Sequence, residues 1–376
     1  MWPEFKDLHK AYRECRMGKP ASAEQTQFET RLGENLLALL REIHFKTYLP
    51  SQAKCFIVPR PKPREIFAAH FRDRIVHHLI VSKLTPFWES RFSDASFACR
   101  KDRGTHGALQ RLLSEIKRVS RQGEVKLHVL KLDIASFFAT IHRGILCGLL
   151  QEENQEPLLS FLIRNSFGHD SRDSFIFQGK KNLSNLIPLE KSWLSQESHR
   201  GLPIGNLTSQ FGANVYLNEC DHWIENHLRP ASYIRYMDDF LFLDSNPKKL
   251  LTFESQIDAW LKKHRGQQLN LKKTKCHSLT EGVSYLGYRV IQKRKDSRMH
   301  QVLFPKAKKW AFIKDLKHLE KTGLPPLEKL HFLSPTLSKR KRTQRLSSVQ
   351  SRLGLMKHAS TRRFRKRAGV TKSLFT

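Results

Sequence analysis

The stretch SYIRYMDDFLFL, residues 232–243, decides the fold of this chain. Its two arms are rich in apolar and aromatic residues and flank Met237 and Asp238, so we expect a β-hairpin with acids at its tip. Asp238 and Asp239 would repel each other and be poorly solvated beside such arms, and a divalent cation would relieve both problems. An ordinary exposed Asp-Asp turn is the alternative, and the apolar arms weigh against it.

A third acid stands at the end of another predicted strand. In KLHVLKLD, residues 126–133, the side chains would alternate between two faces of a strand that ends at Asp133. One face would carry Leu127, Val129, Lys131 and Asp133, and the other His128, Leu130 and Leu132. Strands that are distant in sequence can be neighbours in one sheet, and three carboxylates together could hold two Mg²⁺ ions roughly 3.5–4 Å apart for in-line phosphoryl transfer. One ion would activate a 3′-hydroxyl and the other would stabilise a leaving pyrophosphate. The alternative for Asp133 alone is a helix N-cap.

The charge of the chain requires a polyanionic partner. Its 376 residues include 67 Lys and Arg against 35 Asp and Glu, which gives a formal net charge of +32. Lysine and arginine near phosphates release counterions and supply sequence-independent affinity, so nucleic acid is the leading candidate. An anionic membrane surface is the rival, but the charge is spread along the whole chain and not confined to one amphipathic helix. With 39% hydrophobic residues the chain is too apolar for a disordered basic tail, and its length suggests two or three subdomains.

Local composition argues against membrane proteins and disulfide-rich proteins. The N-terminus, MWPEFKDLHK, has mixed charge, and no stretch approaches the roughly 18–20 apolar residues of a membrane span. We therefore expect a cytoplasmic protein without membrane contact. The six cysteines lie far apart without a CxxC pair, which favours reduced core thiols over a zinc site or disulfides.

The remaining segments predict a mixture of helices, strands and loops. Before residue 126 we expect helices over 1–50, an extended or turn segment over 58–67 (VPRPKPREIF) and a polar, glycine-containing loop over 98–108. After it we expect a polar insertion or long loop over 168–200, a helix capped by Thr208 or Ser209 and a strand pair over 283–291.

Four motifs in this order resemble those of reverse transcriptases: LKLDIASFF, GLPIGNLTSQ, YIRYMDDFLFL and SYLGYRV. PKPREIFAAHFRDRIVHH, ASFACRKDRGTHGA and LGLMKHASTRRFRK are most similar to the diversity-generating retroelement and bacterial retron-type lineage, which includes phage enzymes. The resemblance implies an α+β right-hand polymerase with an antiparallel-sheet palm. Its fingers would span residues 1–125, its palm 126–296 and its basic helical thumb and tail 297–376.

The resemblance also implies roles for single residues. Asp133, Asp238 and Asp239 match the metal-binding carboxylates, with the backbone carbonyl of Ile134 as a further ligand. Phe138 matches the aromatic steric gate that excludes a 2′-hydroxyl, and a plain core phenylalanine is its alternative.

Several cations match positions near the nucleotide. Arg64 and Arg72 match positions at which fingers approach the triphosphate, although a solvated or RNA-backbone role competes for each arginine. Lys273 matches the lysine near the leaving pyrophosphate, with Lys272 and Lys275 as competing choices.

The remaining matches concern nucleotide selection and nucleic-acid binding. Ile204 stands where most reverse transcriptases have Gln, Gly205 allows close approach to the nucleotide, and Gln210 replaces Pro. Tyr285, Leu286 and Gly287 match the primer grip, with a plain strand pair as the alternative. Cations for the nucleic-acid backbone are Lys339, Arg340, Lys341, Arg342, Arg362, Arg363 and Arg365, with a solvated charged tail as the alternative.

The sequence thus predicts an RNA-directed DNA polymerase of bacterial or phage origin. It would use an RNA template, a DNA or RNA primer, dNTPs and two Mg²⁺ ions, with Mn²⁺ as a substitute. Copying adenines unfaithfully in a diversity-generating retroelement is the first interpretation, and a phage-defence or retron-like system is the second. A non-catalytic, maturase-like RNA-binding protein is the alternative from another class. The lineage further implies a basic accessory protein oligomer as a partner, bridged in part by RNA.

Overall fold

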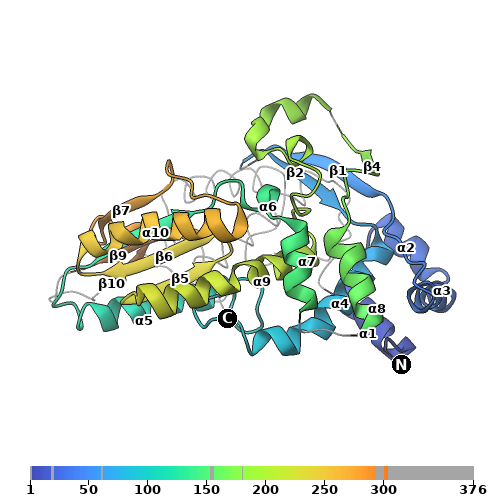
Figure 1. Ribbon diagram of the computed structural model, residues 1–376, viewed down its shortest axis with the longest axis horizontal. Coiled ribbons are helices and arrows are strands. Elements are labelled where there is room, and N and C mark those ends of the chain that lie inside the picture. Colours follow the sequence, from blue (N-terminus) through green and yellow to red (C-terminus); the bar gives the residue numbers. More distant parts are fainter. Residues whose placement is uncertain are drawn as a thin grey trace, which may run out of the picture. The chain divides into compact units, whose positions relative to one another are not determined.

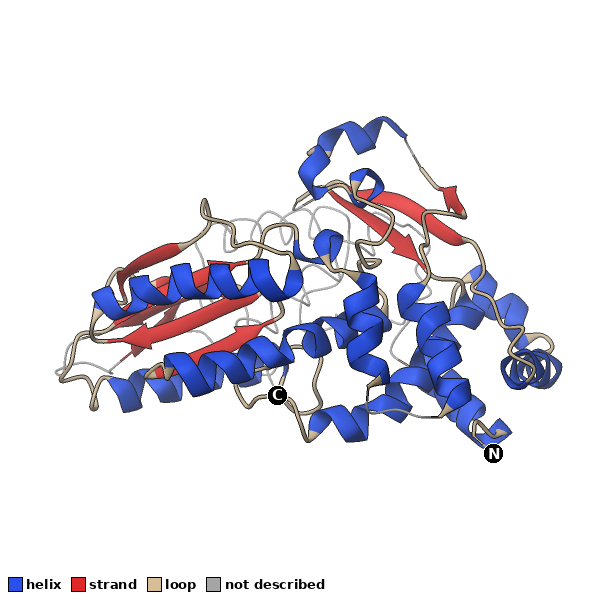
Figure 2. Cartoon of the chain, in the orientation of Figure 1, coloured by secondary structure: helices blue, strands red, loops and turns tan. Residues whose placement is uncertain are grey.

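The computed structural model describes residues 2–17, 21–60, 62–152, 156–179, 181–293 and 300–303. These residues form two compact units, which are described separately. The first consists of the described residues within Met1–Gly104, Lys131–Leu241 and Leu251–Thr274, and the second of those within Thr105–Leu130, Phe242–Leu250 and Lys275–Thr376. Figure 1 labels the elements, and Figure 2 shows helices mixed with strands along the chain, which confirms the α+β class.

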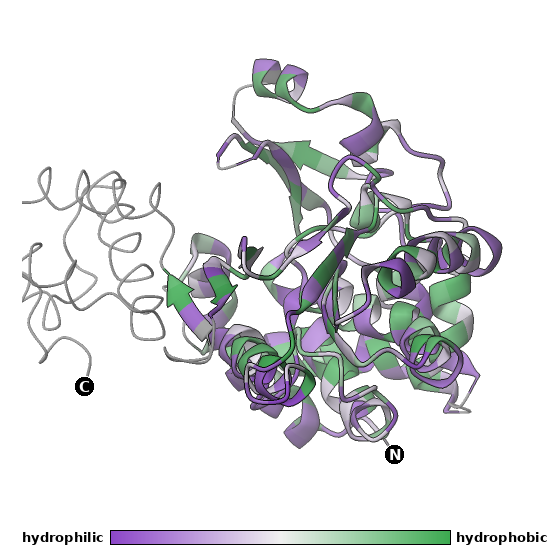
Figure 3. Ribbon diagram, turned by 90° about the vertical axis from the view of Figure 1, so that its left-hand side faces the viewer, coloured by the Kyte–Doolittle hydropathy of each residue, from purple (hydrophilic) through white to green (hydrophobic). Residues whose placement is uncertain are grey.

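Four helices of the first unit come from its N-terminal part. They are α1 (Phe5–Arg16), α2 (Ala23–Glu29), α3 (Leu32–His44) and α4 (Phe71–Glu89). α1 packs on α4 and buries Leu8, Ala11, Tyr12 and Cys15, whose spacing places them on one helix face. Figure 3 shows hydrophobic and hydrophilic residues together on such helices, as amphipathic helices require. The prediction of helices within residues 1–50 is confirmed, with breaks between α1, α2 and α3.

A three-stranded sheet of the first unit has the order β2-β1-β4. Its strands are β1 (Ala53–Val58), β2 (Arg64–Ala68) and β4 (Phe175–Phe177). β1 and β2 pair antiparallel across the proline-containing turn, with Cys55 opposite Phe67, which confirms the predicted extended segment. β4 pairs parallel to β1. Cys55 and Phe67 share a small core with Trp193, whose ring centroid lies 4.8 Å from that of Phe67.

The polar segment 168–200 is more ordered than the predicted loop. Besides β4 it contains the 3₁₀ helices η2 (Lys181–Leu186), η3 (Leu189–Lys191) and η4 (Trp193–Ser195). The buried Glu65 carboxylate accepts a hydrogen bond from the Trp193 amide at 2.7 Å. Arg172 donates to the carbonyl oxygens of Trp193 and Gln196, at 2.8 and 2.7 Å. Such tertiary contacts order a polar segment and correct the expectation of a plain loop.

The predicted loop over 98–108 ends earlier than expected. Helix α5 (Gly104–Val119) begins at Gly104, whose φ is +59°. Leu109, Leu112 and Ile116 form a buried face of this helix, and burial of that face outweighs the polar residues of its first turn. The loop prediction is therefore wrong from Gly104 onward.

A four-stranded sheet carries the acids and has the order β5-β6-β3-β7. Its strands are β3 (His128–Asp133), β5 (Ser232–Tyr236), β6 (Asp239–Asp244) and β7 (Lys275–Ser278). Two residues, Met237 and Asp238, join β5 to β6, so these neighbouring strands run antiparallel (Figure 1). The boundary between the units passes through β3 and β6. A strand that ends at Asp133 and a hairpin with acids at its tip were both predicted, and both are confirmed.

The other helices include a long one that is buried on most sides. They are α6 (Phe137–Thr140), α7 (Arg143–Gln151), α8 (Pro157–Ile163), η1 (Arg164–Gly168), α9 (Leu207–Trp223), η5 (Ile224–Leu228) and α10 (Pro247–Arg265). α9 packs on α4 and α7. Its N-cap is Asn206, not Thr208 or Ser209, because the helix begins at Leu207. Thr208 and Ser209 are instead buried in the first turn.

The second unit contains a further sheet of order β10-β9-β8. Its strands are β8 (Val283–Tyr285), β9 (Tyr288–Gln292) and β10 (His300–Leu303), so the predicted strand pair is confirmed. Of the predicted thumb, 297–376, the structure describes residues 300–303, which form β10; the rest of it, including the basic tail, lies outside the described residues. No helix in the described part of the chain combines the length and apolar composition that a bilayer crossing needs.

Candidate active site

The turn between β5 and β6 places Asp238 beside the sheet in a strained backbone. Met237 has φ +54°, the left-handed region that non-glycine residues seldom occupy. Asp238 follows it and is half-buried, and Asp239 is the first residue of β6. Ile234 and Phe240, one in each arm of the hairpin, are fully buried. The turn therefore holds two carboxylates against an apolar base.

A buried arginine fixes this turn. Arg235 donates to the Met237 carbonyl oxygen at 3.1 Å and to both oxygens of Asp221 at 2.7 and 2.6 Å. Tyr233 donates to the same Asp221 carboxylate at 2.6 Å. Burial lowers the pKa of Arg235, but attraction by Asp221 outweighs it and holds that pKa above the usual value. Sequence reasoning missed this network, although an arginine inside an apolar strand signals a buried acid partner.

Asp133 stands at the end of β3, where the backbone is bound to a neighbouring segment. Its carbonyl oxygen accepts from the Asn270 amide at 2.7 Å, and the Ala135 amide donates to the Gln268 carbonyl at 2.9 Å. Ile134, between them, is bridged to Leu269. In such a pair the flanking residues make the hydrogen bonds, so the Ile134 carbonyl points away from Leu269. The Ile134 carbonyl therefore takes no part in the pairing with residues 268–270, which a metal ligand requires.

The three acids lie close together. The pKa of Asp238 is raised to about 6, first by burial and then by the negative charges of Asp133 and Asp239. Asp133 itself is only 8% exposed. Carboxylates from β3 and from the β5–β6 turn, distant in sequence, thus share one electrostatic environment, in which the charges of Asp133 and Asp239 make the ionisation of Asp238 less favourable.

Two lysines neutralise part of this cluster. The Lys273 ammonium group bonds to Oδ1 of Asp133, and Lys131 Nζ lies 3.2 Å from Oδ1 of Asp239. Of the three lysines considered from the sequence, Lys273 is the one shown here at the acids. Lys131 was not identified from the sequence, although it lies two residues before Asp133 on the same strand. The described residues contain no group of three or more His, Cys, Asp and Glu placed to hold a metal.

The donor set nevertheless suits a hard divalent cation. Carboxylate and carbonyl oxygens are the ligands that Mg²⁺ prefers. Burial, and then the charges of Asp133 and Asp239, raise the pKa of Asp238, and such a cation would offset both effects. Asp133, Asp238, Asp239 and the Ile134 carbonyl are the residues that could hold it.

A family model described as reverse transcriptase (RNA-dependent DNA polymerase) matches residues 59–290, more than half of the chain. The chain belongs to the reverse transcriptase family. The expected right-hand polymerase fold and the enzyme class are thereby confirmed at the level of the family.

Two curated relatives differ in how much of their length this reverse transcriptase covers. Protein YkfC of Escherichia coli K12 is 25% identical over 298 residues, 72% of this chain and 74% of YkfC. The group II intron-encoded protein LtrA of Lactococcus lactis is 23% identical over 220 residues, 57% of this chain and 33% of LtrA. The chain therefore spans about a third of LtrA.

Solved structures with partial similarity include yeast telomerases. The telomerase of Candida albicans, determined with a fragment of telomeric RNA, is 15% identical, with a TM-score of 0.44 over 85% of this chain and 55% of its own. The corresponding Candida tropicalis complex is 14% identical, with a TM-score of 0.48 over 88% of this chain and 59% of its own.

Phe138 lies on α6, a few residues after Asp133. Its ring centroid is 5.2 Å from that of Phe137. Phe137 is 2% exposed and fills the core position, whereas Phe138 is half-buried. The core alternative thus describes Phe137 better than Phe138, and the role of Phe138 as a steric gate stays a prediction.

The segment before α9 has a backbone that requires glycine. Gly205 has φ +105°, and a Cβ added there would lie 3.9 Å from Cγ2 of Ile66 in β2. Ile204 is half-buried. Gln210, one turn into α9, accepts a hydrogen bond through Oε1 from the Cys99 thiol at 3.2 Å. Contacts of these residues with a nucleotide stay predictions.

The two predicted triphosphate ligands differ in their surroundings. Arg64 is exposed at the first position of β2. Arg72 donates to Glu42, through Nη1 at 3.2 Å and through Nη2 at 2.5 Å, and lies over the Tyr48 ring at 5.4 Å. Arg72 would therefore have to exchange Glu42 for a phosphate, whereas Arg64 is accessible as it stands.

The predicted primer grip is a tight turn of the second unit. Leu286 and Gly287, with φ of +44° and +91°, connect β8 to β9. The Tyr285 side chain is 1% exposed and belongs to the core, so Leu286 and Gly287 form the accessible part of the motif. Its role at the primer stays a prediction. The seven tail cations, from Lys339 to Arg365, lie outside the described residues.

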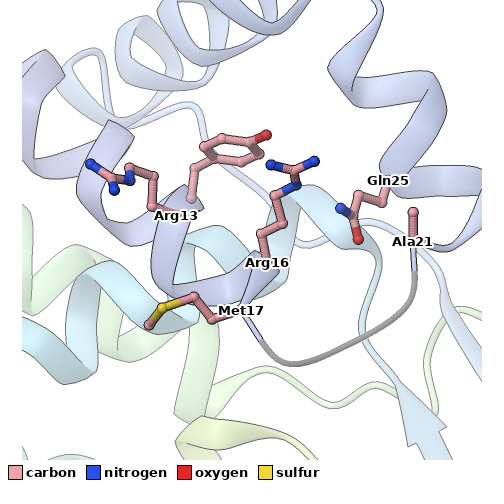
Figure 4. A pocket seen from close by; sticks show the side chains of 6 residues that line it. Arg13, Arg16, Met17, Ala21 and Gln25 are labelled. Carbon is pink, nitrogen blue, oxygen red and sulfur yellow. The ribbon is translucent and has the colours of Figure 1, made fainter. Parts of the chain in front are cut away.

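A hollow of about 430 Å³ lies at α1 and the start of α2, away from the predicted site residues in sequence. Figure 4 shows the side chains that line it, including Arg13, Arg16 and Gln25. Arg16 is paired there with Glu29 at 3.1 Å. None of its lining residues belongs to the predicted site, and we assign it no role.

Proposed function

We propose that this chain is an RNA-directed DNA polymerase that extends a DNA or RNA primer along an RNA template with dNTPs. The observation that carries the proposal is the proximity of the three acids: Asp133 and Asp239 lie near enough to Asp238 for their charges to add to the effect of burial on its pKa. Membership of the reverse transcriptase family supports it. A protein that only binds RNA has no need for three repelling carboxylates beside a strained, anchored turn.

In this proposal each residue of the site has a separate task. Asp133, Asp238, Asp239 and the Ile134 carbonyl hold two Mg²⁺ ions, or Mn²⁺ in their place. When bound, these cations supply Lewis acidity to the primer hydroxyl and the leaving pyrophosphate.

The other residues bind and orient the nucleotide. Phe138 lies below the sugar and excludes a 2′-hydroxyl, and Gly205 lets the backbone approach the nucleotide. Lys273 offers a cation to the pyrophosphate, and Arg64 and Arg72 bind the triphosphate.

The proposed organisation is that of a hand. Fingers span residues 1–125, the palm 126–296 and a basic thumb 297–376, whose lysines and arginines would track the duplex backbone. Cytoplasmic location and a basic accessory oligomer bridged by RNA belong to the same proposal.

The biological system proposed first is a diversity-generating retroelement with error-prone copying. Ile204 supports this choice, because an apolar side chain replaces a hydrogen-bonding Gln near sugar and base. Primer extension on a defined RNA should give errors concentrated at template adenines, and Ile204→Gln should reduce them. Uniform errors at all four bases would favour the phage-defence or retron-like alternative.

The deciding experiment is Mg²⁺-dependent dNTP incorporation on poly(rA)/oligo(dT). We expect activity in the wild type and a loss of at least about a thousandfold in Asp238→Asn and Asp133→Asn, since each removes a metal ligand. Asp94→Asn is the matched control, because this carboxylate is 84% exposed and pairs with Arg103. A wild type that binds RNA but incorporates no dNTP would instead support the maturase-like alternative.

A further inference from the structure

Lys131 faces the acid cluster from an inner strand. It lies two residues before Asp133 on β3, and residues two apart on a strand point to the same face of the sheet. β3 lies between β6 and β7, so it is not an edge strand. Lys131 Nζ lies 3.2 Å from Oδ1 of Asp239, the first residue of β6. Strand geometry and the Nζ–Oδ1 distance therefore both place Lys131 at the acid cluster.

The ion pair is partly sheltered from water. The side chains of Lys131 and Asp239 are each 27% exposed. Salt and solvent screen such a pair less than one on an open surface. By comparison, the Asp94 carboxylate in its pair with Arg103 is 84% exposed.

The lysines offset much of the negative charge of the cluster. Lys273 bonds to Asp133 and Lys131 to Asp239, so two ammonium groups face three carboxylates. A divalent cation that binds Oδ1 of Asp239 must displace the Lys131 ammonium group from that oxygen, because two cations on one oxygen repel each other.

We propose that Lys131 competes with the divalent cation for Asp239 and so sets the cation concentration at which the acid cluster fills. In the metal-free protein Lys131 holds Asp239; once the cation binds, the ammonium group moves aside. The inference rests on the proposed function, because it takes Asp239 as a metal ligand. It concerns Lys131 alone, since Lys273 already has a proposed role at the pyrophosphate.

The test is Mn²⁺ binding to the full chain without nucleic acid or nucleotide, followed by the loss of the electron paramagnetic resonance signal of free Mn²⁺. Lys131→Met removes the ammonium group and keeps an unbranched side chain of similar length. We expect its dissociation constant for Mn²⁺ to be about fivefold lower than that of the wild type, the upper range for one partly exposed ion pair. Lys131→Arg keeps the charge and should bind Mn²⁺ as the wild type does.

Two controls isolate the pair. Lys249→Met removes the same charge and breaks a Lys–Asp pair of 3.5 Å with Asp244, at the other end of β6, and should leave Mn²⁺ affinity unchanged. In an Asp239→Asn background, Lys131→Met should have no further effect, because the pair is already broken. Thermal melting verifies that each variant is folded.

Unchanged or weaker Mn²⁺ binding in Lys131→Met overturns the inference. A wild type that binds no Mn²⁺ overturns it as well, and so does an equal gain in the Asp239→Asn background. Primer extension on the same samples separates this result from the proposed function. If Asp238→Asn abolishes synthesis while Lys131→Met leaves Mn²⁺ binding unchanged, only the role of Lys131 is refuted. If the wild type makes no DNA, the proposed function fails whatever the Mn²⁺ titration shows.

Discussion

Arg235 donates a hydrogen bond to the carbonyl oxygen of Met237, 3.1 Å away, and pairs with Asp221 through Nε and Nη2. Both charged side chains are 0% exposed. Asp238 follows Met237 directly, so the position of a proposed metal ligand depends on an ion pair located behind the turn. The two partners come from β5 and α9, and the turn is therefore fixed to a helix of the core.

Removing one partner of this ion pair should destabilise the protein strongly. Asp221→Asn leaves the Arg235 guanidinium buried without its counter-charge, and we expect the free energy of unfolding to fall by about 3–5 kcal/mol. Urea denaturation measures this. Asp94→Asn, which breaks the exposed pair with Arg103, should change it by less than about 1 kcal/mol. Equal effects of the two variants would contradict a structural role for the Arg235–Asp221 pair.

A buried histidine should make the fold sensitive to acid. Burial lowers the pKa of His77 on α4 to about 3, and His78 and Arg74 add to the shift. Between pH 6.5 and 3, His77 is protonated in the unfolded chain but neutral in the folded chain. The contribution of neutral His77 to stability is therefore present above pH 6.5 and is lost as the pH falls.

His77→Leu should remove that acid sensitivity. Relative to the wild type, the loss of stability between pH 7 and 5 should shrink by about 2 kcal/mol, as follows from an unfolded-state pKa of about 6.5. Chemical denaturation at the two pH values measures it. The same replacement at exposed His106 should leave the acid sensitivity unchanged.

Gly205 should not tolerate a side chain. Its φ of +105° is a backbone conformation that L residues rarely adopt, so Gly205→Ala should cost about 1–3 kcal/mol or force the segment before α9 to move. We expect a higher KM for dNTP in primer extension. Gly148→Ala in α7 meets no atom within 4 Å and should be neutral or stabilising by up to about 1 kcal/mol. An unchanged KM in Gly205→Ala would argue against close approach of the nucleotide.

Phe138 should control the choice of sugar. If its half-buried ring lies under the nucleotide, Phe138→Val should raise the efficiency of rNTP relative to dNTP incorporation more than about tenfold, which corresponds to about 1.4 kcal/mol of lost steric discrimination. Single-nucleotide extension with paired dNTP and rNTP measures the ratio. Phe5→Val, at a phenylalanine that is 40% exposed, is the control for loss of an aromatic side chain. A ratio unchanged by Phe138→Val would make this ring a packing residue.

The acids and their strands could be predicted because their signals are local. Alternation of residues up to Asp133 and the apolar arms around Met237 depend only on near neighbours in sequence. The partners that fix the acids could not be predicted in this way. Arg235 meets Asp221 and Lys131 meets Asp239 only when separate elements pack together.

Errors in the predicted secondary structure have the same origin. β4 is three residues long and exists by pairing with β1, while Trp193 and Glu65 order the polar segment that follows it. The helix that begins at Gly104 depends on burial of Leu112 and Ile116, which outweighs its polar first turn. Composition identifies the segments 98–108 and 168–200 as polar, but it carries no information about their tertiary partners.

The parallel pairing of β1 with β4 bears on the synthesis of this protein. Ala53 is paired with Phe175, so one edge of the first hairpin stays open until the ribosome has released more than about a hundred further residues. At ordinary elongation speeds this interval lasts roughly 6–25 s. Throughout it, the Ala53 amide and the Cys55 carbonyl, which bond to Ser174 and Gln178 in the folded chain, lack those partners and can bind chaperones or other nascent chains.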